Sequence, residues 1–145
     1  MSFSRVLLVL MMGINVLLSS CFRFETIEQP EGAEPNSTFE IGVSIGFPDA
    51  QDSSYHESHY SILLPSDWES DDSLFFTGTL SGVFLFSEEL SDTMEIQDPA
   101  PIGYTWWSYV ASATIDTLAE DGGMISFTQT VQSGAATGLF FLDYC

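Results

Sequence analysis

The sequence predicts an all-β protein whose folded part, residues 38–145, is an antiparallel immunoglobulin-like β-sandwich. Apolar and polar residues alternate from Phe39 to Phe47, as they do on a strand with one buried face. Short runs rich in β-branched and aromatic residues follow, separated by clusters of Pro, Gly, Asp and Ser that are typical of turns. Sustained 3.6-residue periodicity, which would indicate amphipathic helices, is not found along this sequence.

The predicted strands follow one another along the chain. Phe39–Phe47 is the clearest, because its apolar residues occupy every second position. Thr105–Ala113 is rich in aromatic residues, and Ser112–Ala119 would alternatively form a helical turn. The final run stops at Cys145 while its pattern is still that of a strand, which fits either an edge strand or a C-terminally truncated chain. The other predicted strands are Tyr60–Leu64, Leu74–Thr77, Gly82–Phe86, Met124–Val131 and Thr137–Tyr144.

Residues 1–20 form a predicted signal peptide. Arg5 is followed by the apolar run Val6–Leu18, which is too short to span a bilayer comfortably. The sequence Leu18-Ser19-Ser20-Cys21 resembles the lipobox of bacterial lipoproteins, whose cysteine is acylated and becomes the first residue of the mature chain. The resemblance implies a lipid anchor at Cys21. An ordinary cleaved signal and a retained apolar helix are the alternatives.

The residue after Cys21 indicates in which membrane the lipoprotein would be anchored. Phe22 stands where an Asp would retain a lipoprotein at the inner membrane, so the outer membrane is favoured. Whether the chain faces the periplasm or the outside stays open.

Residues 21–37 are predicted to be an acidic flexible tether, because Glu, Pro and Gly dominate Glu28–Asn36 and little apolar surface is available for burial. About 125 residues follow the signal peptide, enough for one domain.

The charge is strongly one-sided. The chain holds 21 Asp and Glu residues against 2 Lys and Arg, and its formal net charge at pH 7 is −19. Carboxylates repel phosphate, so nucleic acid is excluded as a partner. Apolar burial, counter-ions or bound divalent cations must offset the self-repulsion.

If Cys21 is acylated, Cys145 is the only remaining thiol and no intrachain disulfide forms; a Cys21–Cys145 bridge is the competing interpretation.

No catalytic site is predicted, and the chain is interpreted as non-enzymatic. Only His56 and His59 would act as acid–base groups near neutral pH, and no serine lies in a nucleophile motif. With 21 acids in the chain, neighbouring carboxylates such as Glu88-Glu89 are expected from composition alone, which weakens a glycosidase interpretation. The His-x-x-His spacing leaves a metal-binding protein as a less favoured alternative to exposed loop histidines.

Calcium is the one ion retained as a candidate cofactor. Several carboxylates lie close together in a loop after the strand Tyr60–Leu64, and hard oxygen ligands are those that Ca²⁺ prefers. The acid spacing and central glycine of an EF-hand loop are missing, so a solvated acidic loop is the alternative. The candidate ligands are Asp67, Glu69, Asp71 and Asp72.

Three tryptophans are candidate ligand-binding residues. Trp106 and Trp107 are adjacent on a predicted strand, so their side chains point to opposite faces and only one can enter a given core. The other, with Trp68 from a loop, would form an exposed apolar platform for a sugar ring or a cell-surface protein. The alternative is that all three are covered.

Three tripeptides resemble the Asp-Ser/Thr-apolar acceptor site of protein O-glycosylation in Bacteroidota. The resemblance implies modification of Ser73, Thr93 and Thr117. In a chain this rich in acids and hydroxyls, chance matches are the competing explanation.

Four segments together resemble the N-terminal β-sandwich module of large surface lipoproteins of Bacteroidota. The segments are Tyr60–Trp68, Ser91–Met94, Pro101–Trp107 and Thr137–Tyr144. The resemblance implies a surface structural or adhesive module anchored in the outer membrane, and it brings no catalytic residues. A glycan-binding module that uses the tryptophans is the second hypothesis, and a metal-binding protein is the third.

Overall fold

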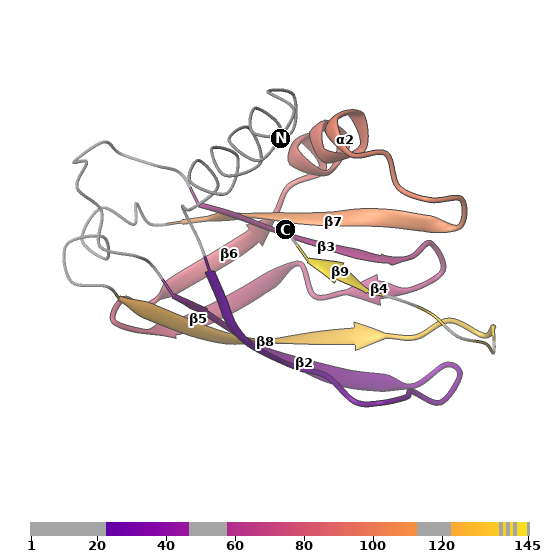
Figure 1. Cartoon of the computed structure of the whole chain (residues 1–145), viewed down its shortest axis with the longest axis horizontal. Helices are drawn as coiled ribbons and strands as arrows, with labels where there is room; N and C mark the ends of the chain where they lie inside the picture. Colours follow the sequence, from indigo (N-terminus) through magenta and orange to yellow (C-terminus); the bar gives the residue numbers. More distant parts are fainter. Residues whose placement is uncertain are drawn as a thin grey trace, which may run out of the picture.

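The computed structural model describes residues 23–46, 58–112, 123–136, 138, 140 and 142–144. It confirms the predicted all-β class, because strands joined in antiparallel pairs dominate these residues (Figure 1). The elements are β1 (Arg23–Glu28), β2 (Thr38–Gly46), β3 (His59–Pro65), β4 (Glu69–Ser70), β5 (Ser73–Gly78), β6 (Gly82–Phe86), α2 (Glu88–Gln97), β7 (Tyr104–Ala111), β8 (Met124–Gln132) and β9 (Asp143–Tyr144).

The strands form one curled sheet. Its order is β1-β2-β8-β5-β6-β7-β3-β9, and β4 pairs with β8 beside this path. The curl brings the two end strands together: the rings of Phe24 in β1 and Tyr144 in β9 lie 6.2 Å apart, and the Tyr144 hydroxyl donates to Gln29. Two separate sheets, as in an immunoglobulin-like sandwich, are not confirmed, because the hydrogen-bonded path is continuous.

The core lies inside the curl and follows from period-2 alternation. On β2, Ile41, Val43 and Ile45 are buried, while on β8 the buried apolar residues include Ile125 and Phe127. The predicted strand Phe39–Phe47 therefore coincides with β2, which pairs with β8 over its whole length. Aromatic rings fill the centre, and their apolar burial is the main stabilising term available to a chain with few cations. These rings belong to Tyr60, Phe76, Phe84, Tyr109 and Phe127.

The large polar side chain of Gln129 is fully buried in this core. Gln129 of β8 accepts a hydrogen bond from the Tyr60 hydroxyl (2.8 Å) and donates to Ser70 Oγ (2.7 Å). The Tyr109 hydroxyl donates within the same group, to Ser70 Oγ at 2.9 Å. A buried amide is tolerated because its donor and acceptor both find partners. Burial raises the pKa of Tyr60 well above 10 and that of Tyr109 to about 12.

The prediction of a flexible tether over residues 21–37 is wrong for its described part. Arg23–Glu28 forms β1 and pairs with β2. The rest is fastened to the loop after β8: Asn36 N–H donates to the Gly134 carbonyl (3.0 Å), and the Ser133 hydroxyl donates to the Glu34 carbonyl (2.7 Å). The composition of this segment led to a wrong prediction, because the segment has little apolar surface of its own. Pairing with β2 and hydrogen bonds from a distant loop order it instead.

The helix α2 was not predicted. Ser87 caps it by accepting a hydrogen bond from Leu90 N–H at 3.2 Å. Glu88 and Glu89 in the first turn stabilise the helix, because their negative charges lie near its partially positive N-terminal end. Its sheet-facing side carries few large apolar residues, which explains the weak periodic signal. Most of the alternative helical turn, Ser112–Ala119, lies outside the described residues. The predicted strand Thr137–Tyr144 is described as a strand only at Asp143–Tyr144.

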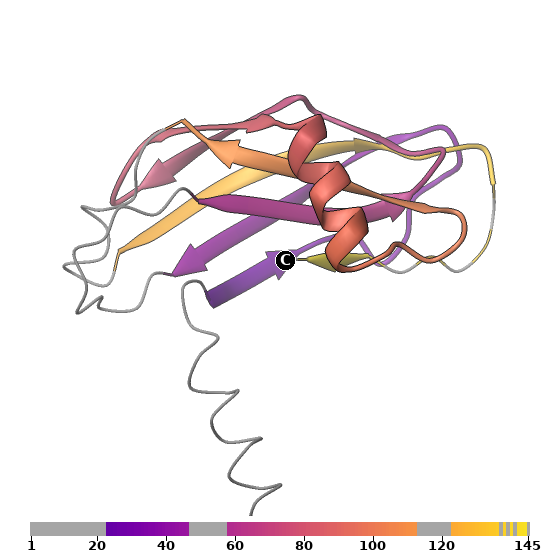
Figure 2. The same cartoon turned by 90° about the horizontal axis from the view of Figure 1, so that it is seen from above.

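The helix lies over β7 and β3 on the outer side of the sheet (Figures 1 and 2). The backbone of Ser108 in β7 binds it twice: Ser87 N–H donates to the Ser108 carbonyl (2.8 Å), and Ser108 N–H donates to Ser91 Oγ (3.0 Å). We call this helix-covered outer side of β7 and β3 the covered face. Within the described parts of the chain, no helix has the length and apolarity needed to cross a membrane.

Candidate binding surface on the uncovered half of the sheet

The outer side of β1, β2, β8 and β5, which we call the open face, carries a row of hydroxyl groups. Ser44 of β2 lies opposite Thr26 of β1 on one side and Ser126 of β8 on the other. Ser126 in turn lies opposite Thr77 of β5. Each of these four positions adjoins a residue on its own strand that packs in or against the core, so its side chain points to the other side of the sheet. The Ser44 and Ser126 hydroxyls are 2.8 Å apart and hydrogen-bonded.

A second row runs beside the first and contains the largest side chains. Gly42 of β2 lies between Glu28 of β1 and Thr128 of β8. Phe75 of β5 lies beyond Thr128, because the next residue, Phe76, pairs with Phe127. The middle of the face therefore has small side chains, or none at Gly42, and Glu28 and Phe75 stand at its two ends.

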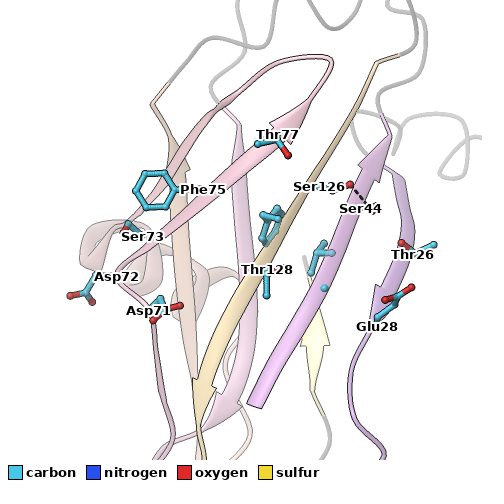
Figure 3. Close-up of a pocket in the computed structure, with 13 residues that line it drawn as sticks. Thr26, Glu28, Ser44, Asp71, Asp72, Ser73, Phe75, Thr77, Ser126 and Thr128 are labelled. Carbon is cyan, nitrogen blue, oxygen red and sulfur yellow. Dashed lines mark hydrogen bonds between the residues drawn. The ribbon is translucent and has the colours of Figure 1, made fainter. Parts of the chain in front are cut away.

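This size pattern creates a shallow hollow of about 740 Å³ (Figure 3). Figure 3 shows the Phe75 ring on one side and the Glu28 carboxylate on the opposite side, with the small side chains of β2 and β8 between them. The lining residues are Thr26, Glu28, Gly42, Val43, Ser44, Asp71, Asp72, Ser73, Phe75, Thr77, Ser126, Phe127 and Thr128.

Two kinds of chemistry meet in the hollow. The Phe75 side chain is 74% exposed and offers an apolar aromatic surface. Glu28, Asp71 and Asp72 are hydrogen-bond acceptors, and no Lys, Arg or His is among the lining residues. Asp71 is oriented by its own contact, because its Oδ2 accepts from Thr130 N–H at 3.1 Å. The hollow thus suits neutral or cationic ligands and repels anions.

The expectation was that one of Trp106 and Trp107 enters the core while the other forms an exposed platform with Trp68. The structure instead buries Trp68 and Trp106 and partly buries Trp107. Trp68 is 8% exposed and packs between the rings of Phe39 (5.6 Å) and Phe140 (5.4 Å). Trp106 is 5% exposed on the covered face, where its indole N–H donates to the Asp98 carbonyl at 2.8 Å.

Trp107 points to the opposite side of β7, as expected for its neighbour in a strand. It is partly buried against the core, 5.0 Å from the ring of Phe86. The aromatic side chain that is most exposed among the described residues is instead Phe75, which is not one of the binding residues predicted from the sequence. One signal was present: in Leu74-Phe75-Phe76, a strand must turn its middle residue away from the core that takes the other two.

The four candidate calcium ligands are spread over the segment around β4. Asp67 packs against Gly134, Glu69 lies exposed in β4, and Asp71 is bound to the backbone of β8. In the parts of the chain described, no group of three or more His, Cys, Asp or Glu side chains is arranged to hold a metal ion. Calcium binding stays a prediction, and a melting curve measured with and without a chelator tests it.

The candidate modification sites have different surroundings. Thr93 is exposed on α2, and its hydroxyl donates to the Glu89 carbonyl at 2.8 Å. Ser73 is partly buried and lines the hollow. Thr117, the proposed anchor Cys21 and His56 lie outside the described residues, while His59 begins β3.

No protein-family model, curated protein sequence or solved structure matches this chain. The resemblance to the surface modules of Bacteroidota therefore stays a prediction.

Proposed function

We propose that this chain is a non-enzymatic lipoprotein of the outer membrane that serves as a structural or adhesive module, either at the cell surface or in the periplasm. The leader supports the anchor: an apolar run, Val6–Leu18, precedes a lipobox-like Leu18-Ser19-Ser20-Cys21. Acyl chains on Cys21 would hold the chain on the membrane without a spanning helix.

The open face is the observation that carries the adhesive role. Four neighbouring strands present hydroxyls, carboxylates and one exposed ring on a broad, shallow surface. A shape of this kind favours contact with a large partner, whereas small substrates are usually enclosed in deeper clefts. In sequence, too, the serines lack an activating base motif, which supports a binding rather than a catalytic role.

The anchor is tested by the intact mass of the full chain extracted with detergent from the membranes of a bacterial host. We expect a mature species that begins at Cys21 and carries acyl chains. Cys21→Ser should prevent acylation, while Cys145→Ser, which changes the other cysteine, should leave the acyl chains in place. An unacylated wild-type protein in the soluble fraction would contradict the lipoprotein proposal.

The side of the membrane is tested on intact cells. If the chain is displayed outside, added protease should remove it without lysis, and an adhesive role requires this result. Protection until the outer membrane is opened would favour a structural role in the periplasm.

Glycan binding is the second candidate function. The version that relies on Trp68 and Trp106 loses its support, since both side chains are buried. The exposed ring of Phe75 next to hydroxyls and carboxylates favours a different location for such a site, the hollow of the open face. Metal capture by His56 and His59 is the weakest candidate, and it predicts that changing both histidines abolishes binding of zinc or copper.

A further inference from the structure

We propose that the hollow of the open face is a glycan site that takes a short stretch of an uncharged oligosaccharide, with Phe75 as its stacking platform. This proposal rests on the adhesive role and gives it a ligand class and a location. It needs no tryptophan and no metal ion.

The first support is shape. The hollow extends across β1, β2, β8 and β5. Four strands about 4.8 Å apart span roughly 14 Å, which suits several linked sugar rings better than one small molecule. The middle of the hollow carries only small side chains at Ser44 and Ser126 and none at Gly42, so a chain of rings would lie along it.

The second support is the distribution of polar and apolar groups. A sugar ring has an apolar face of C–H groups and an edge of hydroxyls. Phe75 matches the first, because an exposed aromatic face gains free energy when such a surface covers it. Glu28 and Asp72 match the second, since carboxylates accept strong hydrogen bonds from hydroxyl donors. The serine and threonine hydroxyls can both donate and accept.

The third support is charge, which narrows the class of glycan. The lining residues Glu28, Asp71 and Asp72 would repel sugars that carry carboxylate or sulfate groups. In the whole chain, only 2 Lys and Arg residues stand against 21 Asp and Glu residues. Neutral glycans are therefore favoured over acidic ones. A basic peptide is the competing partner that the same charge would attract, but it leaves the exposed ring and the hydroxyl rows unexplained.

The test is calorimetric titration of the full chain, solubilised in a detergent without a sugar headgroup. The probes are neutral hexasaccharides of glucose, mannose, galactose and xylose, an acidic hexasaccharide of galacturonic acid, and a lysine-rich peptide. We expect at least one neutral hexasaccharide to bind and the acidic one not to bind. Phe75→Ala should weaken binding about tenfold, as loss of one aromatic contact predicts, while Phe75→Trp should preserve it.

Two further variants separate the site from general surface effects. Ile96→Ala removes a side chain that is 82% exposed on α2, away from the hollow, and should leave the affinity unchanged. Gly42→Val should fill the floor and abolish binding while the chain stays folded, because a Cβ at Gly42 meets Glu28 only at an ordinary contact distance of 3.6 Å.

Several results would overturn the glycan proposal: no neutral hexasaccharide binds, binding survives both Phe75→Ala and Gly42→Val, or only the lysine-rich peptide binds. The lipoprotein proposal fails differently, through an unacylated Cys21, and that result leaves the titration unaffected. The two failures are therefore distinguishable.

Discussion

The two outer faces of this sheet differ in what covers them. On the covered face, Leu63 and Trp106 lie opposite each other in β3 and β7, and both are buried although neither belongs to the central core. On the open face, the corresponding outward positions of β2 and β8 are Gly42, Ser44, Ser126 and Thr128. The helix α2 thus covers the apolar pair Leu63 and Trp106 together with a buried, hydrogen-bonded serine pair, Ser61 and Ser108. Among the described residues, no helix lies over the half with small polar side chains.

This difference indicates what each half is for. Apolar outward residues such as Trp106 require a cover, so the covered face is a second small core that contributes stability. Hydroxyl-bearing residues need no cover, because water satisfies them. Phe75 and Met124 are the exposed apolar exceptions among the described residues of the open face, and an exposed ring among polar groups is a feature that a ligand would use.

The largest difference in stability between the two faces is expected for substitutions of Trp106 on the covered face and Phe75 on the open face. Trp106→Ala should lower the free energy of unfolding by about 3–5 kcal/mol, because it leaves a cavity beneath α2 and removes the hydrogen bond to Asp98. Phe75→Ala should change it by less than about 0.5 kcal/mol. Urea unfolding followed by circular dichroism measures both, and similar losses in the two variants would show that the open face is also a packed interior.

Alkaline pH should destabilise the core, which lies on the inner side of both faces. Burial raises the pKa of Tyr109 to about 12, above its ordinary value of 10. The unfolded chain therefore loses this proton first, so stability is fully present below pH 10 and falls as the pH rises toward 12. The expected loss is roughly 2–3 kcal/mol once the pH passes 12. Tyr109→Phe should flatten this part of the curve of unfolding free energy against pH, and an unchanged curve would argue against a buried hydroxyl.

The hydrogen bonds on the two sides of β8, that of Gln129 with Tyr60 of β3 and that of Ser126 with Ser44 of β2, provide a further comparison. Tyr60→Phe removes the donor to the buried Gln129 amide oxygen and should cost about 1–3 kcal/mol. Ser126→Ala on the open side of β8 removes a partly buried hydroxyl that is hydrogen-bonded to Ser44. Water can replace this partner on the open face, so the change should cost less than about 0.5 kcal/mol. Thermal melting of the two variants tests this order, and a larger loss for Ser126→Ala would reverse our assignment of inside and outside.

Among the variants expected to lose stability, the smallest loss concerns the attachment of α2. Ser87→Ala removes the helix cap, which accepts from Leu90 N–H, and should cost about 1 kcal/mol. Hydrogen exchange should become faster in α2 and in β7 beneath it, and remain unchanged in β2 and β8. Faster exchange across the whole sheet would mean that the helix is not a separate cover.

Local pattern predicted some elements well. The alternation of Phe39–Phe47 located β2, and the runs Tyr60–Leu64 and Gly82–Phe86 located β3 and β6. The order of the strands and the curl were not predicted, because they depend on pairings between residues far apart in sequence. β1 was missed for the same reason, since Arg23–Glu28 becomes a strand only through β2.

The candidate site was harder to predict than the class of fold. A strand pattern predicts on which side of the sheet Trp106 lies, but it does not predict which element covers that side. Trp106 was therefore a candidate for an exposed residue, whereas in the structure α2 covers it. The hollow depends on the register that places Gly42 between Glu28 and Thr128, which no local pattern states. Phe75 lies in the predicted strand Leu74–Thr77, whose alternation indicates that its side chain points away from the core. The sequence pattern does not state whether another element covers that side chain.

The most direct test of the open face as the ligand-binding half is to follow backbone amide signals of the full chain by NMR during titration with the tightest neutral hexasaccharide. We expect the shifts to concentrate at Ser44, Phe75, Ser126 and Thr128, on β2, β5 and β8, and to be absent from α2 and β7. Shifts centred on Phe86 and Trp107, or on α2, would contradict this location and assign binding to the other half of the sheet.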